Sequence, residues 1–106
     1  MPLPVVYRRA ASIEILNTAR RYELERPGLG TAFLDEVTRL EGHISDPPAL
    51  YQIIDDEVRR AVLRRFPFGL FYVAEAERVL VLACLDLRRD PAALGDIVGR
   101  RQVLPI

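Results

Sequence analysis

Arginine is the residue type in this sequence with the clearest capacity for binding chemistry. All fifteen basic residues are arginines. A guanidinium group can bind a phosphate or a carboxylate through two parallel hydrogen bonds. Most of the arginines occur as adjacent pairs, at positions 8/9, 20/21, 59/60, 64/65, 88/89 and 100/101. If several pairs gather on one surface, that surface would bind nucleic acid or an acidic protein, whereas arginines paired with the fifteen acidic residues would form an ordinary solvated surface.

Five of these arginines are candidate binding residues because the sequence places them on or just after expected strands. Neighbouring residues on a strand point to opposite faces, so part of each pair is directed to the open face or rim of a sheet. The pair at 88/89 follows another expected strand and ends near the same sheet. We therefore expect a local positive patch on a neutral protein. The candidate residues are Arg60, Arg64, Arg65, Arg88 and Arg89.

Other side chains offer little for catalysis or metal binding. Cys84 is the only cysteine and His43 the only histidine, which argues against a disulfide framework, a metal site and a histidine-dependent triad. Cys84 lies within an apolar run, where packing is the expected role, and His43 lies near the end of an expected helix. We expect no cofactor and no bound metal.

Length and composition limit the architecture further. The chain has 106 residues, of which 50% are apolar, and 15 basic residues balance 15 acidic ones. This predicts one folded domain over residues 1–106 and excludes a disordered chain. The zero net charge argues against direct binding of nucleic acid by bulk charge. No apolar stretch approaches the roughly 20 residues that span a bilayer, and the first residues do not resemble a signal peptide, so we expect a cytoplasmic protein with no membrane partner.

The expected elements come from periodicity and from proline and glycine positions. Apolar residues recur at helical spacing in two segments that a Pro-Gly-Leu link separates, which predicts an antiparallel helical hairpin. Asp90 and Pro91 resemble the start of a short C-terminal helix that ends near Gly99. The predicted fold is α+β: an N-terminal edge strand and a helical hairpin packed on a small, mainly antiparallel sheet in the order β-α-α-β-β-β. The expected segments are an edge strand over 2–8, helices over 10–26 and 30–45, a connection over 49–57, strands over 58–66, 68–74 and 79–85, and a tail over 101–106.

Three segments resemble a known family. They are residues 26–37 (RPGLGTAFLDEV), residues 58–72 (VRRAVLRRFPFGLFY), and residues 79–85 followed by RRDP at 88–91. In order and spacing they are similar to the RelE/ParE toxin superfamily of bacterial type II toxin–antitoxin modules. The resemblance covers nearly the whole chain. It implies a toxin that a cognate antitoxin holds inactive by wrapping around it.

The family divides into two functional branches, and the residues help to choose between them. RelE-like members are ribosome-dependent endoribonucleases that cut mRNA, whereas ParE-like members act on DNA gyrase. By position, Arg60 and Arg89 retain basic groups of the nuclease branch. A catalytic arginine position falls on Gly69, another basic position on Val62, and a histidine position on Asp86, whose charge would repel RNA phosphate. The resemblance therefore favours a ParE-like gyrase inhibitor with no catalytic residues of its own.

Two alternatives stay open. The first is a RelE-like mRNA endoribonuclease in which Arg60 and Arg89 bind phosphate. The second is an inactive or non-toxic binding module of the same fold. In each case, half of the residues are apolar and only one pair of helices is available to cover one face of the sheet. This predicts an uncovered apolar groove, which an amphipathic helix or an added strand of a partner would fill.

Overall fold

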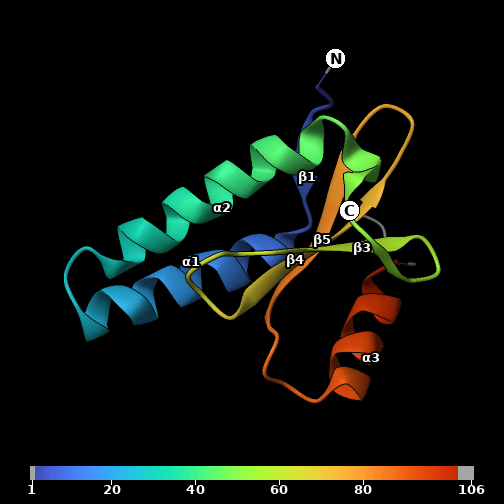
Figure 1. Cartoon of the computed structure of the whole chain (residues 1–106). Coiled ribbons are helices and arrows are strands. Elements are labelled where there is room, and N and C mark those ends of the chain that lie inside the picture. Colours follow the sequence, from blue (N-terminus) through green and yellow to red (C-terminus); the bar gives the residue numbers. More distant parts are fainter. Residues whose placement is uncertain (1, 103–106) are drawn as a thin grey trace.

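A five-stranded sheet forms the centre of the protein, and the computed structural model describes residues 2–102 (Figure 1). The strands lie in the order β1-β5-β4-β3-β2. The elements in chain order are β1 (Val5–Tyr7), α1 (Arg9–Glu25), α2 (Leu29–Ser45), the 3₁₀ turn η1 (Pro48–Leu50), β2 (Ile53–Asp55), β3 (Val58–Val62), β4 (Phe68–Ala74), β5 (Val79–Asp86) and α3 (Pro91–Gln102). The predicted α+β fold is confirmed.

The sheet is mixed only at one edge. β1 pairs with β5 in parallel, with Val5 opposite Val79, and the other neighbouring strands are antiparallel. β1 is an edge strand, as its prolines predicted. The expected connection over 49–57 is wrong in part, because it contains η1 and the second edge strand, β2. The expected strand over 58–66 is shorter than predicted, since β3 ends at Val62.

α1 and α2 form the predicted antiparallel hairpin, which covers one face of the sheet (Figure 1). Phe33, Leu40 and Ile44 place the apolar stripe of α2 in the core, where each is at most 1% exposed. Gly30 permits the two helices to approach, because a Cβ atom there would lie 2.4 Å from the carbonyl oxygen of Ala19. The absence of a side chain at Gly30 therefore allows the start of α2 to pack directly on the backbone of α1.

α3 covers the opposite face of the sheet, so the strands have a core on both sides. Asp90 caps this helix through a hydrogen bond from the amide of Ala92, as the sequence predicted. The helix continues to Gln102, beyond the expected end at Gly99, and the rest of the expected tail over 101–106 lies outside the described residues. Successive residues of β5 point to opposite faces and so contribute to both cores, and a register shift between Phe71 and Tyr72 places one extra residue in β5.

None of the helices in residues 2–102 combines the length and the apolar character that a bilayer crossing requires.

Candidate functional site

The turn between β3 and β4, residues 63–67, carries two of the candidate arginines. The amide of Leu63 donates to the carbonyl oxygen of Phe68 at 2.9 Å and closes the turn. The buried carboxylate of Glu36 on α2 accepts hydrogen bonds from the amides of Arg64 at 2.8 Å and Arg65 at 3.2 Å. Both arginine side chains remain exposed, with 62% of the Arg65 side chain accessible. The sequence had placed this pair on a strand, whereas the structure places it on a turn held by α2.

Four aromatic rings support this turn from inside. Tyr22, Phe33, Phe66 and Phe68 pack together at the end of the hairpin where the link joins α1 and α2, and the rings of Tyr22 and Phe66 have centroids 4.8 Å apart. The guanidinium carbon of Arg65 lies 5.8 Å from the centroid of the Phe66 ring, which is within cation–π range. The aromatic cluster therefore fixes the base of the turn while the charged groups face outward.

The second pair of candidate arginines lies beside the turn. The amide of Leu87 donates to the carbonyl oxygen of Pro67 at 2.8 Å, so the loop after β5 and the 63–67 turn are in contact. In that loop, Arg88 binds the carboxylate of Asp86 through its side chain at 2.7 and 3.0 Å and through its amide at 2.9 Å. This hydrogen bonding lowers the pKa of Asp86 to about 2. Asp86 is thus an anion at neutral pH, and its charge is matched by Arg88.

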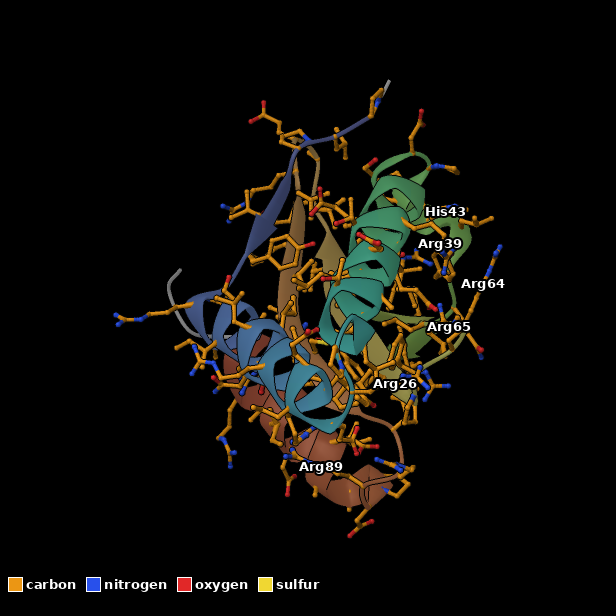
Figure 2. The ribbon with its side chains drawn as sticks, turned by 90° about the vertical axis from the view of Figure 1, so that its left-hand side faces the viewer. Arg26, Arg39, His43, Arg64, Arg65 and Arg89 are labelled. Atoms are coloured by element: carbon orange, nitrogen blue, oxygen red, sulfur yellow. The ribbon has the colours of Figure 1, made fainter. Side chains whose placement is uncertain are left out.

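Cationic side chains from separate elements share one side of the molecule. Figure 2 shows Arg64 and Arg65 on the same side as Arg26 and Arg39, with Arg89 at its lower end. We call this set of five side chains the cationic side. Arg26 and Arg39 were not predicted from the sequence, because each is a single arginine on or next to a helix and not part of a pair.

Arg60 does not belong to the cationic side. It lies on β3 and lines a pocket of about 310 Å³ between the sheet and α3, together with Asp55 and Phe71. Gly69, which lies opposite the end of β3, packs closely against the Arg60 side chain. A Cβ atom at Gly69 would be 3.4 Å from Cγ of Arg60 and 3.2 Å from Cδ2 of Leu87. The structure therefore brings four of the five predicted arginines onto two adjoining loops and leaves Arg60 facing α3.

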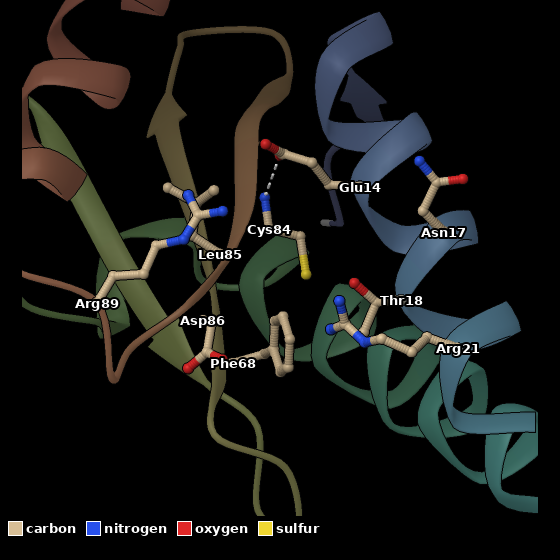
Figure 3. Close-up of a pocket in the computed structure, with 9 residues that line it drawn as sticks. All are labelled: Glu14, Asn17, Thr18, Arg21, Phe68, Cys84, Leu85, Asp86 and Arg89. Carbon is tan, nitrogen blue, oxygen red and sulfur yellow. Dashed lines mark hydrogen bonds between the residues drawn. The ribbon is translucent and has the colours of Figure 1, made fainter. Parts of the chain in front are cut away.

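A second pocket, of about 250 Å³, lies between α1 and β5 (Figure 3). Its polar lining includes Arg21 from α1 and Arg89 from the loop after β5. The carboxylate of Glu14 accepts two hydrogen bonds from Arg101 at 2.8 Å and one from the amide of Cys84 at 3.1 Å. The other residues that line the pocket are Asn17, Thr18, Phe68, Cys84, Leu85 and Asp86.

Two titratable groups in this pocket, Cys84 and Asp86, each keep a fixed protonation state around neutral pH. Burial, with a smaller contribution from the nearby Glu14 carboxylate, raises the pKa of the Cys84 thiol to about 12, so the thiol stays neutral. Asp86 stays ionised, since its pKa is lowered to about 2. Neither group is suited to proton transfer near pH 7. Within residues 2–102, no three or more histidine, cysteine or carboxylate side chains form a cluster that could hold a metal ion.

An apolar groove of about 230 Å³ lies where α1, α2 and β1 meet, in agreement with the expectation from composition. Ile15, Leu16 and Val37 supply its apolar lining, and 59% of Leu16 is exposed. Tyr7 lines its floor and donates a hydrogen bond from its hydroxyl to Glu41 at 2.6 Å. A groove with this apolar lining suits the apolar face of a partner segment.

Glu36, which positions the 63–67 turn, was not predicted from the sequence, although its place in the helical pattern could have indicated it. It lies on the apolar stripe of α2, three residues after Phe33 and four before Leu40. A carboxylate at a buried stripe position requires hydrogen-bond donors from elsewhere in the chain. That reasoning identifies Glu36 as a partner for a distant backbone, without naming the turn that it binds.

Comparison with known proteins supports the fold and little beyond it. No protein-family model and no curated protein sequence matches the chain. A solved structure titled "Chromosomal ParDE TA system from P. aeruginosa" contains a similar chain, with a TM-score of 0.70 and 12% sequence identity. The match covers 80% of this chain and 96% of that one. The fold that the RelE/ParE resemblance implied is thus confirmed.

Proposed function

We propose that this protein is the toxin of a bacterial toxin–antitoxin module, a ParE-like inhibitor of DNA gyrase that a cognate antitoxin neutralises. The observation that carries the proposal is the fold shared with a chain of a ParDE system over 80% of the sequence. The three family-like segments of the sequence lie on the elements that form this fold: the hairpin, β3 and β4, and β5 with its loop.

The side-chain chemistry supports binding to a protein target. The arginines of the 63–67 turn face outward, and both the turn and the loop that carries Arg89 are fixed by backbone hydrogen bonds. Exposed guanidinium groups on a rigid base suit a surface that recognises carboxylates of a partner. Two positions of the nuclease branch lack the required group, since Gly69 has no side chain and Asp86 carries a negative charge.

The groove between α1, α2 and β1 is the surface that we assign to the antitoxin. It is apolar, and its exposed residue, Leu16, lies beside the edge of the sheet where β1 has a free side. An amphipathic segment of the antitoxin would bury Leu16 and could extend along β1. Antitoxin binding at this groove and target binding at the cationic side then use separate surfaces.

Expression in a bacterial host tests the toxin assignment and the groove together. We expect growth arrest on induction and its reversal when the product of the adjacent reading frame is co-expressed. Leu16→Asp should preserve arrest but weaken the reversal, because it places a charge in the groove. Leu24→Asp is the matched control, since Leu24 lies on the same helix, is 83% exposed and does not line the groove.

The readouts separate the proposal from the two alternatives. Absence of growth arrest would favour the non-toxic binding module. Arrest together with ribosome-dependent mRNA cleavage in an in-vitro translation reaction would favour the RelE-like endoribonuclease. Arrest with intact mRNA supports the ParE-like assignment.

A further inference from the structure

The pocket between α1 and β5 has two guanidinium groups directed at it from different elements. Arg21 extends from α1, and Arg89 extends from the loop after β5 (Figure 3). Figure 3 shows the two guanidinium groups on either side of the Cys84 side chain. Within residues 2–102, neither arginine side chain has a hydrogen bond or an ion pair to another residue. These two groups are therefore available to a ligand.

The carboxylates of the same pocket are already occupied. Both oxygens of Glu14 are bound by Arg101, and both oxygens of Asp86 are bound by Arg88. Each carboxylate thus has its own guanidinium partner, and neither Arg21 nor Arg89 takes part in these two ion pairs, while Arg21 lies near enough to Asp86 to help lower the pKa of that carboxyl. The neutral thiol of Cys84, which lies between them, adds no negative charge.

The geometry selects the shape of the ligand. A carboxylate offers its acceptor sites in a single plane, whereas a phosphoryl group offers three or more oxygens that point in different directions. Two forks that approach from opposite sides therefore suit a phosphoryl group better. Asn17 and Thr18 add polar side chains along the α1 wall, and a pocket of about 250 Å³ has room for a phosphate and a small attached group.

We propose that this pocket binds a phosphoryl group, either as inorganic phosphate or as a small phosphate monoester, held between Arg21 and Arg89. The proposal does not depend on the toxin assignment, because it concerns the pocket alone. Phosphate binding and gyrase inhibition can each be present without the other.

Titration of the purified full-length protein with inorganic phosphate, at constant ionic strength and followed by amide NMR shifts, tests the proposal. We expect saturable shifts confined to residues 14–21 and 84–89, and at least about tenfold weaker binding of acetate. Arg21→Gln and Arg89→Gln should each weaken phosphate binding by about tenfold, since each removes one charge-assisted fork. Arg20→Gln is the matched control, because Arg20 is an exposed neighbour on α1 that does not line the pocket.

Asp86→Asn provides a test with the opposite sign. It removes a negative charge from the pocket lining, so phosphate affinity should be retained or increased. Circular dichroism of each variant checks that the fold is intact. A parallel titration with ribose 5-phosphate identifies the source of the phosphoryl group: tighter binding than inorganic phosphate supports a monoester, and equal binding supports phosphate itself.

The proposal is overturned if phosphate and acetate cause the same non-saturating shifts. It is also overturned if Arg21→Gln and Arg89→Gln behave like Arg20→Gln. Either result would show general screening of surface charge and no site.

Discussion

The carboxylate of Glu36 holds the backbone amide of Arg65, 29 residues further along the chain, with both oxygens at 3.2 Å. The same carboxylate binds the amide of Arg64 at 2.8 Å. One buried side chain of α2 therefore fixes the position of the turn that presents both guanidinium groups. Nε of Arg65 also lies 4.0 Å from the carboxylate, yet 62% of the Arg65 side chain remains exposed to a partner.

Removing the Glu36 carboxylate should destabilise the protein and loosen this turn. Glu36→Ala leaves two amides without their acceptor, which costs about 1–3 kcal/mol. Urea unfolding measures the loss, and hydrogen exchange of the amides of Arg64 and Arg65 should become faster. Asp35→Ala is the control, because Asp35 is an exposed carboxylate at the neighbouring position of the same helix, and Ala favours the helix in both variants. Equal unfolding free energies for the two variants would contradict the positioning role.

The ion pair between Glu14 and Arg101 should couple α3 to α1. Its two hydrogen bonds are both 2.8 Å, the side chains are only 23% and 18% exposed, and Arg101 also donates to the carbonyl oxygen of Leu82. A double-mutant cycle with Glu14→Gln and Arg101→Gln should give a coupling energy of about 1–3 kcal/mol in the free energy of unfolding. A coupling energy near zero would show that this ion pair does not couple α3 to α1.

Alkaline pH should destabilise the fold in a way that depends on Cys84. Burial raises the pKa of this thiol from about 9 to about 12, so the unfolded chain loses the proton first. The contribution to stability is therefore complete below pH 9 and is lost as the pH rises towards 12. Burial of Tyr72, whose pKa rises to about 12, acts in the same direction. Urea unfolding between pH 8 and pH 11 should show a shallower decline for Cys84→Ala than for the natural sequence, and identical slopes would refute this role.

The helices and central strands could be predicted because each has a strong local signal. The apolar stripe of α2 has helical spacing, and β5 is an unbroken apolar run that is buried on both faces. β2 could not be found in this way. It is only three residues long and exposed throughout, and it pairs with β3 through a register shift, so tertiary pairing and not local pattern creates it.

The candidate site could be predicted in its residue types but not in its arrangement. Adjacent arginine pairs identified the residues, because a pair is visible in the sequence, but the pattern placed Arg64 and Arg65 on a strand and not on a turn. The position of Arg60 on the far face depends on the register of β3 against β4, where Arg60 lies opposite Phe71, and that register is a tertiary pairing. The pairing of Arg21 with Arg89 across a pocket requires knowledge of how α1 packs on β5, which no local spacing contains.

A supercoiling assay with purified DNA gyrase and relaxed plasmid tests the central claim most directly. We predict that the protein blocks supercoiling and that R64Q/R65Q weakens this inhibition by about tenfold or more, since loss of surface charge slows and weakens binding to an acidic partner. The variant should keep its fold, because the amide contacts to Glu36 remain and the Arg65 contacts that it loses to Glu36 and Phe66 are made by an exposed side chain. Arg9→Gln, which replaces an exposed arginine at the start of α1, should leave inhibition unchanged. Unchanged gyrase activity at large molar excess of the protein would contradict the assignment.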